Sequence, residues 1–247
     1  MTNVSAAAPT AEREFRIGQV FNRSLTLLSR NFLPFFVITT IAALPNVLIT
    51  QSIALEPGNA SAGWLVVAGL LTIALSMLSQ AVVLYGAFQD MRGRPVNLGE
   101  SVRVALSRLL SIIGLAFLVS FGVFVGALLL IVPGFILLTM WFVATPACVV
   151  EGLGPLASMG RSSAITKGHR WKIFGMVLLV LVGAGIVGAI IGAVLGLTGS
   201  TVLVGLGSLI WSGVWGAFYA IFVVVTYHDL RVAKEGIDTD QIASVFD

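Results

Sequence analysis

The sequence predicts an all-α integral membrane protein. The predicted fold is a bundle of six transmembrane helices, arranged as three hairpins that are each preceded by an amphipathic or basic helix on the cytoplasmic surface. One observation is composition: 57% of the 247 residues are hydrophobic and only 10% are charged, whereas about a quarter of a soluble domain is charged. The other observations are that apolar residues form long unbroken runs and that lysine and arginine are confined to alternate loops, as in multi-pass membrane proteins.

Six apolar stretches approach or exceed the roughly 20 residues that a membrane-crossing helix needs. Pro45 predicts a kink in the first span, and Pro146 predicts one at the end of the short fourth span, because proline removes a helical hydrogen bond. The pair Pro133-Gly134 predicts a tight turn between the third and fourth spans. The predicted spans are residues 32–54, 64–88, 110–132, 135–150, 173–197 and 201–227.

A segment with basic residues and helical character precedes each predicted hairpin. Residues 14–31 and the stretch before the third span have apolar residues at helical spacing, which predicts helices that lie along the membrane surface. Residues 155–166 are the third such helix, with a weaker apolar face. In the second helix the apolar stripe consists of Leu98, Val102, Leu106 and Leu109.

These units make one membrane domain, residues 13–235, between a disordered tail of residues 1–12 and a cytoplasmic tail of residues 236–247. The first and third units share the pairs Arg23-Ser24 and Arg161-Ser162 at equivalent positions. A threefold duplication and a shared membrane composition both explain this pattern.

The 14 lysine and arginine residues lie before the first span, after the second, after the fourth and after the sixth. The three opposite loops contain none. Because positively charged loops stay in the cytoplasm, we expect both termini to be cytoplasmic.

The sequence contains no recognisable catalytic, cofactor-binding or metal-binding site, and we do not expect an enzyme. No ionisable residue lies in the core of a predicted span, which argues against a proton-coupled pump. The motifs His-Glu-x-x-His and Gly-Lys-Ser/Thr are absent, so neither a zinc peptidase nor a P-loop is predicted. We interpret Asp229 and Glu235 as solvated tail charges, with Arg231 placed to pair with Glu235 at i,i+4.

The candidate site is the loop before the fifth span, which combines four potential cations with an aromatic residue suited to a membrane interface. Such residues at the start of a span fix the orientation of the helix in the membrane, and this role alone explains their presence. A sharper interpretation is a contact site for anionic lipid headgroups. The residues are Lys167, His169, Arg170, Trp171 and Lys172.

Small residues recur at every fourth position in the last two spans, as they do in helices that approach closely. Packing within the six-helix bundle is the main interpretation, and a dimer face is the alternative. The residues are Gly188, Gly192 and Gly196 in the fifth span and Ser208, Ser212 and Gly216 in the sixth.

Three stretches are PGFILLTMWFVATPACVVEGLGPLASMGRSSAITKGHRWKIFG (133–175), IGQVFNRSLTLLSRNFLPF (17–35) and YHDLRVAKEG (227–236). They resemble a family of bacterial multi-pass membrane proteins that includes the membrane domain of some glycerophosphoryl diester phosphodiesterases. The resemblance implies an all-helical bundle in the bacterial cytoplasmic (inner) membrane, with no established chemistry of its own. Those enzymes act through a separate catalytic barrel, for which these 247 residues leave no room, so neither their activity nor any catalytic residue is transferred.

Together these observations favour a non-enzymatic membrane scaffold. Its expected partners are membrane lipids, anionic ones included, a second copy of the chain or another membrane protein; nucleic acid is not expected. The alternative is a transporter or channel for a neutral or amphipathic small molecule or lipid, because prolines and polar residues interrupt the first and fourth spans. A water-accessible cavity in mid-membrane would favour transport if it were lined by Asn46, Thr50, Gln51 or Gln80.

Overall fold

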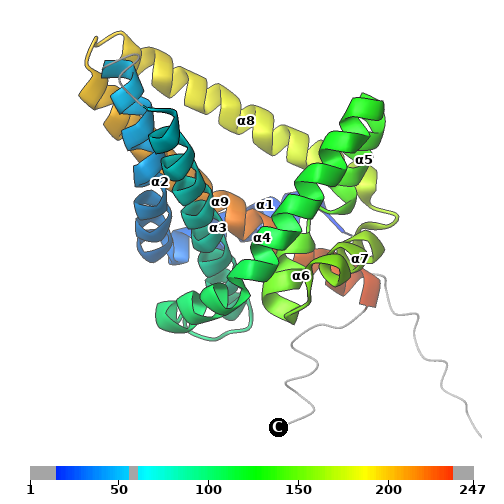
Figure 1. Cartoon of the computed structure of the whole chain (residues 1–247). Coiled ribbons are helices and arrows are strands. Elements are labelled where there is room, and N and C mark those ends of the chain that lie inside the picture. Colours follow the sequence, from blue (N-terminus) through cyan, green and yellow to red (C-terminus); the bar gives the residue numbers. More distant parts are fainter. Residues whose placement is uncertain (1–14, 56–60, 236–247) are drawn as a thin grey trace, which may run out of the picture.

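The computed structural model describes residues 15–55 and 61–235, and within these residues the chain forms helices and no strand (Figure 1). The tails predicted at residues 1–12 and 236–247 lie outside the described residues. The helices are α1 (Ile17–Arg30), α2 (Phe32–Leu55), α3 (Ala62–Met91), α4 (Leu98–Leu129), α5 (Ile131–Met140), α6 (Ala144–Glu151), α7 (Pro155–Thr166), α8 (Arg170–Gly196) and α9 (Thr201–Glu235).

Among the described residues, six segments are long and apolar enough to cross a membrane. Five of them lie in the single helices α2, α3, α4, α8 and α9, and the remaining one, Val132–Glu151, combines α5 with α6. The prediction of an all-helical fold with six segments long and apolar enough to span a membrane is therefore confirmed, whereas the three hairpins and their surface helices stay predictions.

Helix α9 is the central element of the fold. It packs against α1, α2, α3 and α8, and it meets α6 and α7 near its carboxyl end. Residues 220–228 of α9 are all buried, whereas between Thr201 and Gly216 only Gly205 and Gly213 are buried. In Figure 1, α4 and α5 stand beside the group formed by α2, α3 and α9, and α8 crosses from α5 toward the start of α9.

The second predicted surface helix and the third predicted span form one continuous helix, α4. No proline separates the two stretches, so the ladder of helical hydrogen bonds continues. The predicted apolar stripe does not face the protein core, because Val102 and Leu106 are 38% and 52% exposed, and its contact with the membrane surface stays a prediction. The buried face runs instead through the small residues Ser101 and Ala105, which allow close packing.

The turn predicted at Pro133-Gly134 is wrong. Both residues lie in the first turn of α5, and the chain leaves α4 at Leu130, which has an extended backbone. Proline fits at the start of a helix because the N–H groups of the first turn have no helical partner. Gly134 lets α4 and α5 approach closely, since a β-carbon there would lie 2.9 Å from Ala127.

The predicted fourth span is interrupted at residues 141–143, between α5 and α6. Pro146 explains the interruption, because proline has no N–H to donate to the carbonyl four residues earlier and clashes with it. The carbonyl of Met140, at the end of α5, accepts hydrogen bonds from the hydroxyls of Ser162 (2.8 Å) and Thr166 (3.2 Å) in α7. Side chains of α7 therefore satisfy the backbone at this break.

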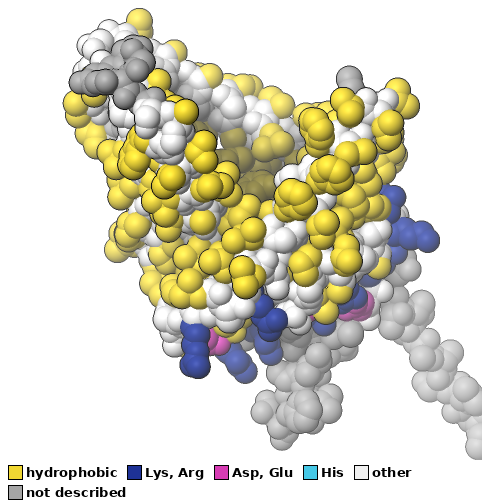
Figure 2. Space-filling view, viewed as in Figure 1, with side chains coloured by type: hydrophobic (Ala, Val, Ile, Leu, Met, Phe, Trp, Pro, Cys, Tyr) yellow, Lys and Arg dark blue, Asp and Glu magenta, His cyan; other side chains and the backbone are white. Residues whose placement is uncertain are grey.

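Lysine and arginine side chains gather at one end of the molecule, which we call the charged end (Figure 2). It comprises α1, the α3–α4 connection, the segment from α6 to the start of α8, and the last turns of α9. Helix α9 continues to Glu235, although the predicted span ended at residue 227. Residues 228–235, which follow the predicted last span, are therefore part of the helical structure of the charged end.

Candidate functional site

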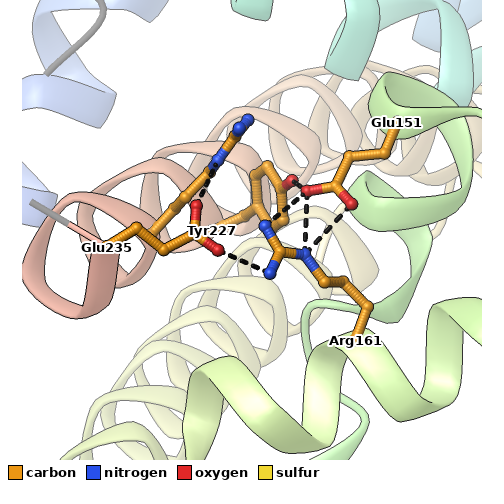
Figure 3. A network of polar contacts seen from close by, with 5 residues as sticks. Glu151, Arg161, Tyr227 and Glu235 are labelled. Carbon is orange, nitrogen blue, oxygen red and sulfur yellow. Dashed lines mark hydrogen bonds and ion pairs between the residues drawn. The ribbon is translucent and has the colours of Figure 1, made fainter. Parts of the chain in front are cut away.

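Five side chains from three helices form a polar network at the charged end, which we call the Arg161 network (Figure 3). Its members are Glu151 at the end of α6, Arg161 in α7, and Tyr227, Arg231 and Glu235 on α9. Successive members on α9 are four residues apart, so they lie on one face of the helix.

Arg161 is the centre of this network. Its Nε donates to both carboxylate oxygens of Glu151 at 3.0 Å, and its Nη1 lies 2.5 Å from Oε1 of Glu235. Tyr227 donates its hydroxyl to Glu151, and Arg231 donates to the second oxygen of Glu235 at 2.9 Å. The predicted pair of Arg231 and Glu235 is confirmed, whereas the interpretation of Glu235 as a solvated charge is wrong.

The Arg161 network is largely withdrawn from solvent. The side chains of Arg161, Glu151 and Glu235 are 26%, 19% and 24% exposed. The hydrogen bond to Glu235 is the main cause that raises the pKa of the Arg161 guanidinium, burial opposes this rise, and the hydrogen bond to Glu151 adds to it. Arg161 is therefore charged and internally neutralised, and it ties α6, α7 and α9 together.

A second arginine pairs with α9 in the same way. Arg23 of α1 donates to Asp229 at 2.6 Å, and the Asp229 side chain is only 13% exposed. Asp229 is therefore not the solvated charge that the sequence suggested. In the repeated Arg-Ser pattern, both arginines bind an acidic residue of α9 and both serines, Ser24 and Ser162, are fully buried.

The basic segment, residues 167–172, connects α7 to α8 and includes the start of α8. Lys167, Trp171 and Lys172 are exposed, Trp171 by 84%, whereas His169 and Arg170 are partly buried. Among the described residues, neither Lys167 nor Arg170 forms an ion pair with a carboxylate. The Nε of Arg170 and the Nδ1 of His169 are buried atoms without a hydrogen-bond partner in the described part of the chain.

His169 lies among positive charges. The edge of its ring meets the ring of Phe15, with 5.7 Å between the centroids. Burial is the main cause that lowers the pKa of His169, and the charges of Lys172 and Lys234 lower it further. The neutral imidazole is therefore favoured, and an anion bound beside it would favour the protonated form.

The two regions differ in what they can bind. The Arg161 network pairs both of its guanidinium groups with carboxylates of the same chain. The basic segment presents the side chains of Lys167 and Arg170 beside an exposed tryptophan, an arrangement suited to a phosphate at a membrane interface. Within the described residues, no group of three or more His, Cys, Asp or Glu side chains lies close enough to hold a metal ion.

Two of the predicted packing residues lie against a neighbouring helix. A β-carbon at Gly188 would lie 3.0 Å from Nε1 of Trp211, and one at Gly216 would lie 3.3 Å from Thr39 of α2. The other four lie where the structure leaves more space. They are Gly192 and Gly196, where a β-carbon would have no atom of another element within 4 Å, Ser208, which is exposed, and Ser212, which is partly exposed.

Glu151 and Tyr227 were not among the site residues predicted from the sequence. A signal for Glu151 was present, because it is the only acidic residue between Glu100 and Asp229. A lone carboxylate at the end of an apolar run, followed by basic residues, indicates an internal ion pair because buried charges are rarely left unpaired. Tyr227 gave no such signal, since tyrosine is common at the ends of membrane spans.

Residues 117–230 match the family described as Domain of unknown function (DUF7847). The match starts within α4 and ends on α9, so it contains Glu151, Arg161, Tyr227 and the basic segment. Neither a curated protein nor a solved structure matches the chain. The family match carries no link to the glycerophosphoryl diester phosphodiesterases, so that resemblance remains a prediction from the sequence.

Proposed function

We propose that this protein is a non-enzymatic scaffold of the bacterial inner membrane whose basic segment binds the phosphate of anionic lipid headgroups. The contrast between two arginines of one connection carries the proposal. Arg161 has two carboxylate partners, whereas the Nε of Arg170 is buried without a partner among the described residues. A buried donor without an acceptor is unfavourable, and a lipid phosphate beside the exposed Trp171 would supply the acceptor.

In this proposal the charged end faces the cytoplasm, because loops rich in lysine and arginine stay on that side. Both termini are then cytoplasmic, and α1, the start of α4 and α7 precede three hairpins. Packing of α2 on α3, of α4 on α5 and of α8 on α9 supports this arrangement. Alkaline phosphatase fused after Asp247 should be inactive, because this reporter folds only outside the cytoplasm; an active fusion would contradict the orientation.

The lipid proposal is tested by native mass spectrometry of the protein in nanodiscs that contain both anionic and zwitterionic phospholipids. Wild-type protein should retain anionic lipid preferentially. The triple variant Lys167→Gln, Arg170→Gln and Lys172→Gln should lose this preference. The matched control removes three cations from the α3–α4 region, by changing Arg92, Arg94 and Arg103 to Gln.

The control variant should keep the preference, because those arginines are exposed and lie in a different connection from the exposed Trp171 and the buried, unpartnered Nε of Arg170. Equal loss in both triple variants would show a general effect of net charge. Unchanged anionic lipid in the basic-segment variant would reject the proposal.

The second candidate function is transport of a neutral or amphipathic molecule, and the hollow side of the molecule in Figure 2 favours it. Two polar residues of the first span are engaged within the protein: Gln51 donates to the carbonyl of Thr201 at 2.6 Å, and Thr50 donates to that of Asn46 at 2.9 Å. Neither of the two described cavities is lined by these residues or by Gln80. Flux of such a molecule into liposomes above the protein-free rate would support transport.

A second copy of the chain is the proposed protein partner, because α8 leaves open space beside Gly192 and Gly196. Small residues at this spacing allow helices of two copies to approach closely. The substitution Gly192→Ile should then leave the protein folded and convert a dimer to a monomer in size-exclusion chromatography with light scattering. A wild-type monomer would contradict this partner.

A further inference from the structure

The middle of α8 lies apart from the rest of the protein. Near its start α8 meets α5, where the ring centroids of Phe174 and Phe135 are 5.4 Å apart, and near its end it meets α9, where Gly188 lies against Trp211. Between these contacts, residues 181–187 include no buried side chain. Seven residues make about two helical turns, and among them only Ala184 is partly buried, so no face of the helix is fully covered there.

The face of α8 that points toward the protein can be assigned from the helical repeat. Val180 is buried and Gly188 contacts α9, and Ala184 lies on the same face midway between them. Leu181 and Val187 are within about 60° of Ala184 around the helix axis, yet they are 49% and 43% exposed. The inward face of α8 is therefore only partly covered across these two turns, at Ala184.

A row of aromatic residues on α9 lies across from the inward face of α8. Trp211, which contacts α8, is followed by Trp215 at 6.3 Å between ring centroids, and Trp215 is followed by Phe218 at 6.1 Å. Trp215 and Phe218 are partly exposed, although they continue the face of α9 that meets α8. The row ends at the buried Phe222, whose ring packs on rings from α1 and from the break between α5 and α6. Along α9, Phe222 lies between this aromatic row and Tyr227 of the Arg161 network.

Figure 2 shows a hollow between the side formed by α2 and α3 and the side formed by α4 and α5, with hydrophobic side chains on its walls. Residues 181–187 lie at the middle of α8, which has 27 residues and is therefore about 40 Å long. Water does not suit this space, because each buried water needs about 2–4 polar partners. An empty space is also unfavourable, because its apolar lining would lose dispersion contacts.

We propose that the acyl chains of membrane lipids fill the space between α8 and α9. Acyl chains are the apolar material that surrounds a membrane-spanning helix at this depth, and the hollow opens to the side of the molecule (Figure 2). The loop that joins α8 to α9 contains no lysine or arginine. The bound lipid would therefore be held by its acyl chains and not by the charge of its headgroup. The lipid-filled space does not depend on the basic segment and goes beyond the proposed headgroup site.

The test is electron paramagnetic resonance of a spin label at Ala184→Cys in liposomes, in a background with Cys148→Ala to remove the single native cysteine. Ile186→Cys is the lipid-facing reference, because residue 186 lies about 200° around the helix from residue 184. Val180→Cys is the packed reference, since Val180 is 5% exposed. Collisions with oxygen report apolar surroundings, and collisions with a nickel chelate report water.

The label at residue 184 should collide with oxygen as often as the label at 186 and clearly more often than the label at 180, while the nickel chelate reaches none of them. Low oxygen collision at 184, equal to that at 180, would show that protein fills the space and would overturn the proposal. Access of the nickel chelate to 184 would show water and would also overturn it. Val187→Cys is the second label position if the variant at 184 fails to fold. Loss of the proposed headgroup site would change none of these collision rates.

Discussion

Arg161 and Arg170 lie in the same connection between two membrane segments, and their environments differ completely. Arg161 sits between Glu151 and Glu235, with contacts of 2.9 and 2.5 Å. Arg170 forms no ion pair among the described residues, and its Nε lacks a hydrogen-bond partner there. In the sequence both are basic residues that anchor topology. The structure shows that one is bound by carboxylates of two other helices, whereas the Nε of the other has no acceptor among the described residues.

The comparison teaches that the number of basic residues at a membrane surface does not measure its capacity for anionic lipid. A cation that is neutralised by its own chain contributes to stability, and breaking such a pair leaves carboxylates that were shielded from water without a partner. A cation without an internal partner contributes little to stability and keeps its charge for a ligand. Each prediction below tests either the cations that are paired within the chain or the cations of the basic segment.

The largest expected effect is that of Arg161→Gln. This change removes the partner of two carboxylates that are 19% and 24% exposed, and we expect destabilisation of about 2–3 kcal/mol, below the value for a fully buried pair because of residual solvent screening. Thermal unfolding in mild detergent would measure it. Arg161→Lys keeps the charge but loses the planar guanidinium that binds two carboxylates at once. Its melting temperature should therefore lie between those of the wild type and Arg161→Gln. A wild-type melting temperature for Arg161→Gln would show that the network is not structural.

Ser162→Ala should destabilise the protein by about 1 kcal/mol, the usual net value of a buried hydrogen bond. Ser162 is fully buried and its hydroxyl donates to the carbonyl of Met140 at the break between α5 and α6. The control is Ser163→Ala, whose side chain is more exposed. Anionic lipid retention should be unchanged in both variants. A loss of lipid in Ser162→Ala would mean that α7 contacts the ligand directly.

Arg23→Gln should have a smaller effect, about 0.5 kcal/mol, although Arg23 also pairs with an acidic residue of α9. The Arg23 side chain is 53% exposed, and exposed ion pairs contribute little. Asp229→Asn should have a similar effect, and the double variant should be no worse than either single one. A loss as large as that of Arg161→Gln would show that exposure does not separate the two pairs.

The smallest expected effect is a pH dependence of lipid retention through His169. Burial and then Lys172 and Lys234 lower the pKa of His169, so the free protein carries a neutral imidazole at pH 7. A bound phosphate favours the protonated form, so retention of anionic lipid should rise modestly as the pH falls below 7 toward 5. Native mass spectrometry of His169→Phe should show a weaker rise. An identical pH profile in both proteins would exclude His169 from the site.

The sequence predicted the membrane class and most span boundaries, because long apolar runs have one stable environment. Pro146 predicted a kink near the end of the fourth span, but it did not show that the kink is a break at residues 141–143 or that α7 binds the carbonyl of Met140 there. The sequence also did not predict that Glu235 reaches Arg161, because ion pairs between distant segments depend on how the helices pack. The basic segment was found from its residue types, but its contrast with Arg161 required coordinates.

The most direct test of this division measures stability and lipid retention together for Arg161→Gln and Arg170→Gln. The account predicts opposite outcomes: Arg161→Gln lowers the melting temperature and keeps anionic lipid, whereas Arg170→Gln keeps the melting temperature and loses anionic lipid. Native mass spectrometry and thermal unfolding on the same nanodisc preparations provide both values. If Arg170→Gln lost stability while keeping its lipid, or if both variants lost the same lipid, the division between paired and available cations would be contradicted.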